Sequence, residues 1–224
     1  MSASPTTAGV LASTFPERAD PLTHGLRVAL IAAAVGRMLG LEGEQLEQVV
    51  AAGFLHDVGK AAVPRAVCEK PGPLNDEEWE LMRRHPEASE EFARVLTDEP
   101  EILAAIRSHH ERWDGSGYPD GLAEGEIPLG ARIVAVADAV AAMTESRPYR
   151  PAATLESAAE EVGRGRGRQF DPRCLDAFDA IVPSLRGRLL RGSAPLTLRR
   201  ALDQGRARIE RELRASAADI AQLA

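Results

Sequence analysis

Apolar residues recur at helical spacing through most of the chain, and no stretch alternates between apolar and polar residues as a strand would. The clearest segment is "RIVAVADAVAAM" (132–143), and Gly and Pro separate it from its neighbours. Aromatic residues, which favour strands, make up 4% of the chain, whereas Ala, Leu, Arg and Glu dominate. These features predict an all-α fold.

Capping and breaking residues set the expected ends of the helices. Asn75 and Glu78 form a close variant of the capping box, Pro86 predicts a helix break at His85, and Pro100 suits a first helical turn. The predicted helices cover 22–39, 42–59, 75–85, 100–111 and 129–144, shorter helices begin at Thr154 and Pro172, and a charged amphipathic helix covers 197–222. In the first helix, we expect Leu22, Leu26, Leu30 and Ala33 on the buried face.

Composition divides the chain into a body and two flanks. Residues 1–19 are predicted to be a loose tail, 20–185 a catalytic domain, and 186–224 a basic hinge with an amphipathic helix that could form a homodimer seam. The net charge of −7 argues against duplex nucleic acid as a ligand. Cys68 and Cys174 lack metal-ligand spacing and are expected to be free thiols. Without a signal peptide or a long apolar run, we expect a cytoplasmic protein that does not span a membrane.

The histidines are best interpreted as one set. A single buried histidine is more often a hydrogen-bonded core residue than a metal ligand. Here, however, all five histidines of the chain lie on or at the ends of predicted helices: His24, His56, His85, His109 and His110. Asp57 adjoins one of them, and Asp138 lies in an apolar helix, where an unpaired carboxylate is costly. The set therefore predicts a metal centre.

The types of ligand narrow the chemistry of this centre. Imidazole and carboxylate without cysteine suit zinc, iron, manganese, nickel or cobalt, and the ligands are too numerous for one four-coordinate ion. A carboxylate between histidines can bridge two ions, an arrangement that activates hydroxide for attack on phosphorus and neutralises phosphate oxygens. The residue types alone thus favour a dinuclear phosphohydrolase.

Several motifs extend this interpretation to a family. In chain order they are "THGLRVA", "FLHDVGK", "VPRAV", "KPGPLNDEEWELMRRHPE", "HHERWDGSGYPDGL", "ARIVAVADAVAAMTESRPYR" and "GRGRQFDP". Together they cover roughly residues 20–181, and the chain resembles the HD-GYP family, the cyclic-di-GMP phosphodiesterases among the HD metallohydrolases. The resemblance implies an HD-domain helical bundle with the additional C-terminal helices of the HD-GYP type.

The resemblance also implies roles for single residues. One metal would be surrounded by His24, His56, Asp57 and Asp138, and a second held by His85, His109 and His110. Asp57 would bridge the ions together with a hydroxide that attacks the phosphodiester. Lys60 would contact the scissile phosphate and assist the leaving oxygen, and Arg147 and Arg150 would hold the other phosphate. Tyr118, in the Gly-Tyr-Pro turn, would admit the dinucleotide or meet a protein partner.

The number and identity of the ions stay open at this stage. We expect two divalent transition metal ions, iron or manganese ahead of nickel, cobalt or zinc. Some members of the family bind a third ion through a glutamate four residues before the first histidine, where this chain has Asp20. Asp20 either contributes to a third site or only caps the helix that follows.

The function that the resemblance implies is hydrolysis of cyclic-di-GMP to linear pGpG, and whether pGpG or GMP is the end product stays open. Two alternatives remain. One is another HD-type nucleotide phosphohydrolase, which would not require His85, the His109–His110 pair and the Gly-Tyr-Pro turn together. The other is a cyclic-di-GMP receptor or a scaffold that docks GGDEF-type cyclases through that turn.

Overall fold

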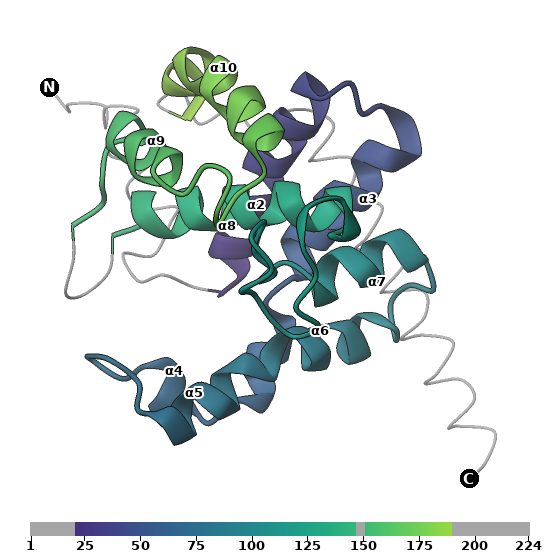
Figure 1. Cartoon of the computed structure of the whole chain (residues 1–224), viewed down its shortest axis with the longest axis vertical. Helices are drawn as coiled ribbons and strands as arrows, with labels where there is room; N and C mark the ends of the chain where they lie inside the picture. Colours follow the sequence, from purple (N-terminus) through teal and green to yellow (C-terminus); the bar gives the residue numbers. More distant parts are fainter. Residues whose placement is uncertain (1–20, 147–150, 190–224) are drawn as a thin grey trace, which may run out of the picture. The chain divides into compact units, whose positions relative to one another are not determined.

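The structure is a computed structural model that describes residues 21–146 and 151–189. Within these ranges the chain is helical and contains no strand, as predicted. The elements, drawn in Figure 1, are α2 (Pro21–Met38), α3 (Gly43–Leu55), the 3₁₀ helix η1 (Val58–Ala62), α4 (Arg65–Cys68), α5 (Asp76–Arg83), α6 (His85–Ala93), α7 (Pro100–Arg107), the 3₁₀ helix η2 (Glu124–Glu126), α8 (Leu129–Thr144), α9 (Leu155–Gly163) and α10 (Pro172–Leu189).

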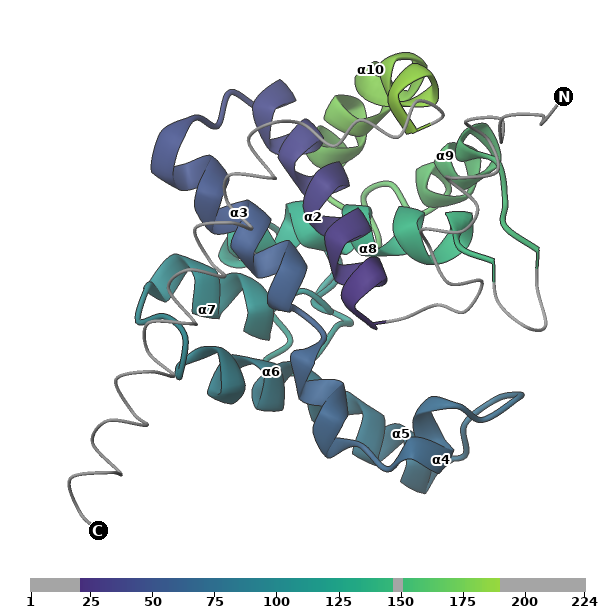
Figure 2. The ribbon, with the colours of Figure 1, turned by 180° about the vertical axis from the view of Figure 1, so that it is seen from behind.

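The core is built around α8. This helix packs against α2, α3, α7, α9 and α10, and Figures 1 and 2 show it crossing among them from both sides. Most of its apolar side chains are buried, including Ile133, Val136 and Ala137. Asp138 therefore projects from a helix whose apolar side chains are mostly buried, which explains why its carboxylate needs a partner.

The expected buried face of the first helix is partly wrong. Leu22 is 58% exposed, whereas Val28, Ile31 and Val35 are buried. The helix α2 contacts α3, α8 and α10, so its C-terminal half is covered on several sides while its first turn is not. Which residues of α2 are buried depends on these neighbouring helices. The spacing of apolar residues in the sequence does not show where the neighbours lie.

The expected capping box at the start of α5 and the helix break next to His85 are confirmed, whereas the helix α6 that follows was not predicted. The Asn75 side chain accepts a hydrogen bond from the Glu78 backbone N–H, and the Glu78 carboxylate accepts one from the Asn75 N–H. The break falls at Arg84, so that His85 opens α6 with Pro86 in its first turn. In both views α4 and α5 extend away from the other helices, and α5 leads directly into α6 (Figures 1 and 2).

The helix predicted over 42–59 is too long. α3 ends at Leu55, and the chain tightens through His56 and Asp57 into η1. The cause is close packing of η1 on α6, because a Cβ atom on Gly59 would lie 2.3 Å from the His85 carbonyl oxygen and from the Ser89 nitrogen. The Gly59 N–H donates to the buried Ser89 hydroxyl, 2.8 Å away, and this contact fixes the turn that carries His56 and Asp57.

Other predictions lie at the borders of the described ranges. α10 runs to Leu189 and so passes the expected start of the basic hinge at residue 186. Asp20, Arg147, Arg150, the tail 1–19 and the helix 197–222 lie outside the described residues, and the proposed division of the chain stays a prediction. Both cysteines are free, with Cys68 exposed and Cys174 buried. None of the described helices combines the length and the apolar character needed to cross a membrane.

Candidate metal centre

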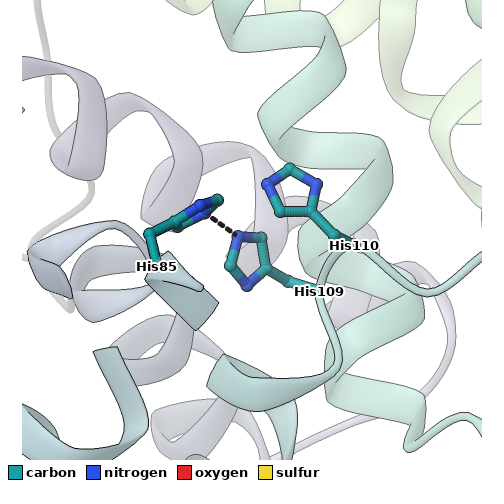
Figure 3. Close-up of side chains that lie close together, drawn as sticks. All are labelled: His85, His109 and His110. Carbon is teal, nitrogen blue, oxygen red and sulfur yellow. Dashed lines mark hydrogen bonds between the residues drawn. The ribbon is translucent and has the colours of Figure 1, made fainter. Parts of the chain in front are cut away.

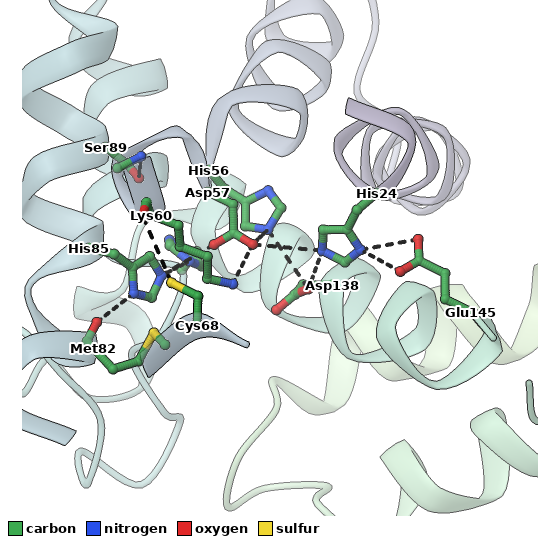
Figure 4. Close-up of polar contacts among 12 residues, drawn as sticks. His24, His56, Asp57, Lys60, Cys68, Met82, His85, Ser89, Asp138 and Glu145 are labelled. Carbon is green, nitrogen blue, oxygen red and sulfur yellow. Dashed lines mark hydrogen bonds and ion pairs between the residues drawn. The ribbon is translucent and has the colours of Figure 1, made fainter. Parts of the chain in front are cut away.

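Four of the expected ligands converge from three separate parts of the chain. His24 comes from α2, His56 and Asp57 from the turn after α3, and Asp138 from α8 (Figure 4). The Nε2 atom of His24 lies 3.0 Å from Oδ1 of Asp138, and Nε2 of His56 lies 3.3 Å from Oδ2 of Asp57. The ligand atoms of His24, His56 and Asp138 all lie within 4.8 Å of one another, close enough to hold one ion.

A second group lies on the other side of Asp57. Figure 3 shows His85, from the start of α6, facing His109 and His110, which follow α7. The Nε2 atoms of His85 and His109 are 3.4 Å apart, and Nε2 of His85 lies 3.3 Å from Oδ1 of Asp57. The two carboxylate oxygens of Asp57 therefore face different histidine groups, which is the geometry that a bridging ligand requires.

Backbone carbonyls orient three of the histidine rings. The Nδ1–H groups of His56, His85 and His109 donate to the carbonyl oxygens of the residues three positions earlier, at 2.8, 2.7 and 2.6 Å. A carbonyl oxygen can only accept, so Nδ1 carries a proton, and Nε2 is the nitrogen whose lone pair is available when the ring is neutral. All three rings thus present a metal-binding nitrogen to the centre of the cluster.

His24 is oriented in a different way. Its Nδ1 faces the carboxylate of Glu145, with distances of 3.2 and 3.1 Å to the two oxygens. Glu145 is buried directly after α8, and Arg27 lies 3.7 Å from it. A carboxylate behind a histidine fixes the ring and increases its basicity as a metal ligand. The sequence prediction missed Glu145, which lies one residue beyond the end of the helix that carries Asp138.

Two features show that the cluster suits metal ions. The Nε2 atom of His56 and Oδ1 of Asp57 are buried without a hydrogen-bond partner, which a folded protein tolerates only where another group satisfies them. When both rings are neutral, the facing Nε2 atoms of His85 and His109, 3.4 Å apart, both carry lone pairs, so neither can donate to the other. A cation among these atoms would resolve both conflicts, and nitrogen with carboxylate oxygen is a donor set for transition metals.

The pKa values of the cluster point in the same direction. Burial alone would lower the pKa of His24, but its contacts with Asp138 and Glu145 raise it to about 9. Burial likewise opposes protonation of His56, yet Asp57 and Asp138 raise its pKa to about 10. The carboxylates thus attract a positive charge, and without an ion a proton on histidine supplies it. Burial lowers the pKa of His110 to about 4, which keeps this ring neutral and able to bind a metal.

The turn after the paired histidines is held rigidly. Glu111 is 3% exposed, and its carboxylate accepts hydrogen bonds from the backbone N–H groups of Asp120 and Gly121 at 2.6 and 3.0 Å. Arg107 binds the Asp120 carboxylate through two nitrogens, at 2.7 and 2.8 Å. A Cβ atom on Gly117 would lie 2.3 Å from the Arg112 nitrogen, so only glycine fits there. Sequence reasoning missed the role of Glu111, although it directly follows the histidine pair.

The remaining expected site residues lie at the edge of the cluster. The Tyr118 ring stacks on His110 with centroids 5.0 Å apart, and Nζ of Lys60 lies 2.5 Å from Oδ2 of Asp57. The Lys60 side chain is 41% exposed, so its ammonium is accessible beside the cluster. The structure thus brings together all the expected residues that fall within its described ranges.

Comparison with known proteins agrees with this architecture. Residues 11–174 match the family model described as the HD domain. The chain is 45% identical over 165 residues to the cyclic di-GMP phosphodiesterase response regulator RpfG of Xanthomonas campestris, covering 72% of this chain and 42% of that protein. It is 37% identical over 174 residues to the 3'3'-cGAMP-specific phosphodiesterase 2 of Vibrio cholerae, covering 72% of this chain and 33% of that protein.

Solved structures share the fold. A cyclic GMP-AMP-specific phosphodiesterase of V. cholerae superimposes with a TM-score of 0.62 at 21% identity, over 80% of this chain and 48% of that chain. An HD-GYP-type protein of Bdellovibrio bacteriovorus gives a TM-score of 0.60 at 19% identity, over 73% of this chain and 53% of that chain.

The helical fold, the histidine–aspartate cluster and these matches define a protein of the HD-domain class. The chain belongs to the HD-domain family and, within it, to the HD-GYP group. It spans less than half the length of the two curated relatives.

Proposed function

We propose that this chain is a cyclic-dinucleotide phosphodiesterase that hydrolyses cyclic-di-GMP to pGpG and further to GMP. The observation that carries the proposal is the convergence of histidine nitrogens on both oxygens of Asp57, with the rings held from behind. The names of the relatives support the substrate class, because they act on cyclic di-GMP or 3'3'-cGAMP.

We propose that the cluster binds two divalent metal ions. Iron or manganese is preferred, and nickel, cobalt and zinc are the alternatives. One would lie among His24, His56, Asp57 and Asp138, and the other among Asp57, His85, His109 and His110. When bound, such ions lower the pKa of water and neutralise charge on phosphoryl oxygens. A third ion at Asp20 stays a prediction.

The protein's own groups bind and orient the substrate in this proposal. Lys60 is a positive side chain beside Asp57 and is partly exposed, so it would contact the scissile phosphate and assist the leaving oxygen. Burial raises the pKa of Tyr118, so its phenol stays protonated and can donate a hydrogen bond to the dinucleotide. Arg147 and Arg150 would hold the second phosphate through their guanidinium groups.

Product chromatography tests the proposal. The protein is loaded with manganese or iron under reducing conditions and incubated with cyclic-di-GMP, 3'3'-cGAMP and ordinary nucleotides. We expect pGpG from cyclic-di-GMP, with GMP following. The 37% identity to a 3'3'-cGAMP-specific enzyme makes that dinucleotide the second candidate substrate.

The other outcomes separate the alternatives. Hydrolysis of ordinary nucleotides with cyclic dinucleotides left intact would assign the chain to a different HD branch. Tight binding of cyclic-di-GMP without turnover by the metal-loaded protein would instead favour a receptor. A cytoplasmic location, a homodimer and docking of GGDEF proteins through the turn at Tyr118 stay predictions.

A further inference from the structure

A row of stacked side chains leads outward from the candidate metal centre. The Tyr118 ring covers His110, with an interplanar angle of 23°. The guanidinium carbon of Arg83 lies 5.8 Å from the centroid of the Tyr118 ring and 6.0 Å from that of Trp79. Trp79 ends the row and is 44% exposed, which is unusual for so large an apolar side chain.

Arg83 is exposed and has no side-chain hydrogen bond or ion pair with any residue in the part of the chain that the structure describes. Two aromatic rings lie against the guanidinium, so its N–H donors remain available at its edge. An arginine fork presents two parallel donors, and this arrangement matches a pair of neighbouring acceptors.

Arg83 directly follows a residue that orients a candidate metal ligand. Met82, the preceding residue, supplies the carbonyl that accepts the Nδ1–H of His85 at 2.7 Å. The same end of α5 therefore orients a candidate ligand and presents Arg83 beside Tyr118. A dinucleotide with one phosphate at the cluster would have a base within reach of this row.

We propose that Arg83 and Trp79 recognise a guanine base of the substrate, an inference that rests on the proposed function. Guanine offers O6 and N7 as two adjacent acceptors, the preferred partner of an arginine fork. Adenine has an amino group in place of O6. This group is a hydrogen-bond donor, so it cannot accept a hydrogen bond from the guanidinium. Trp79 supplies an exposed aromatic face for stacking, which tolerates either base.

Relative rates on three substrates test this inference. The metal-loaded enzyme and the variants Arg83→Ala, Arg83→Lys and Trp79→Ala are assayed for kcat/KM on cyclic-di-GMP, 3'3'-cGAMP and cyclic-di-AMP. For the wild type we expect the highest kcat/KM with cyclic-di-GMP. Arg83→Ala should lower that value by about 10- to 100-fold and leave cyclic-di-AMP hydrolysis nearly unchanged. Arg83→Lys should not restore the preference, because lysine keeps the charge but lacks the fork.

Matched control variants test whether a substitution lowers activity on every substrate or only on those that contain guanine. Arg84 is the neighbouring exposed arginine on the chain, and Arg84→Ala should keep the wild-type preference. Trp79→Ala should lower kcat/KM for all three substrates while keeping their order. Metal content, measured on every variant, should stay at the wild-type level.

Two results would overturn the inference. An equal loss on all three substrates in Arg83→Ala would show that Arg83 binds a phosphate, and a wild type without preference for guanine would exclude base selection. Calorimetric binding of GMP against AMP separates this inference from the proposed function. If no cyclic dinucleotide is hydrolysed while GMP binding still depends on Arg83, the phosphodiesterase proposal fails and the guanine site stands.

Discussion

At the scale of single residues, the centre depends on how each imidazole is held. His56, His85 and His109 use the backbone carbonyl three residues earlier, so their orientation follows from the local chain path. His24 depends instead on the side chain of Glu145. Of these four histidines, His24 is therefore the one whose orientation a single side-chain substitution can change without altering the backbone.

We predict that Glu145→Ala weakens metal binding by roughly 10- to 100-fold, the usual effect of removing a carboxylate behind a metal-binding histidine. Glu145→Gln should lose less metal affinity, because the amide oxygen of Gln can still accept a hydrogen bond from Nδ1 of His24. Competition with a chelating dye measures both affinities, and Glu160→Ala, an exposed change on α9, is the control. Wild-type affinity in Glu145→Ala would show that His24 needs no support from this carboxylate.

Residue types were enough to predict which side chains meet, but not what supports them. Five histidines and two aspartates stand out because each is rare or costly in its helix. Glu145 and Glu111 are ordinary glutamates by sequence, and only the tertiary fold buries them beside His24 and the turn at residues 120–121. Their roles depend on contacts between distant segments, which periodicity does not encode.

At the scale of elements, the segment 111–121 is a shaped turn between α7 and α8. Glu111 replaces the hydrogen bonds that the Asp120 and Gly121 N–H groups would make in a helix or sheet. Arg107 ties Asp120 back to α7, and the same guanidinium contacts Glu90 on α6 at 3.1 Å. The contacts of Glu111 and Arg107 thus hold the turn that carries Tyr118 and stacks it on His110.

Glu111→Ala is expected to lower the free energy of unfolding by about 2 kcal/mol, because two backbone donors lose a charged acceptor. The change is measured by thermal and denaturant unfolding of the metal-loaded protein. Glu47→Ala, an exposed change on α3, should cost much less. Equal unfolding midpoints for the two variants would contradict the role assigned to Glu111.

The helix boundaries show the limits of local prediction. Caps and prolines located the starts of α5, α7 and α9 well, because those signals act within one turn. The helix predicted over 100–111 was too long, since α7 ends at Arg107, and α6 was not predicted as a separate helix. The end of α3 was missed, since it depends on the contact of Gly59 with His85 and Ser89, some thirty residues away along the chain.

At the scale of the whole molecule, the cluster joins α2, the turn after α3, α6, the segment after α7, and α8. An ion bound among these elements would connect parts of the chain that are far apart in sequence. Because metal binds the folded state and not the unfolded chain, binding adds to the free energy of unfolding.

Metal removal should therefore lower the melting temperature. Free metal at about 100 times its Kd adds about 2.7 kcal/mol, which for a chain of this size corresponds to a shift of roughly 5–10 °C. Calorimetric scans before and after chelation, and again after metal is restored, measure this shift. An unchanged melting temperature would contradict a metal centre that links these helices.

The most direct test of the central claim is a titration of metal-free protein with manganese, in which bound metal and cyclic-di-GMP hydrolysis are measured on the same samples. We predict that activity rises with the second equivalent and that Asp57→Asn binds fewer ions and loses at least about 100-fold in kcat/KM. Full activity with one equivalent, or wild-type metal content and turnover in Asp57→Asn, would contradict a two-ion centre bridged by Asp57.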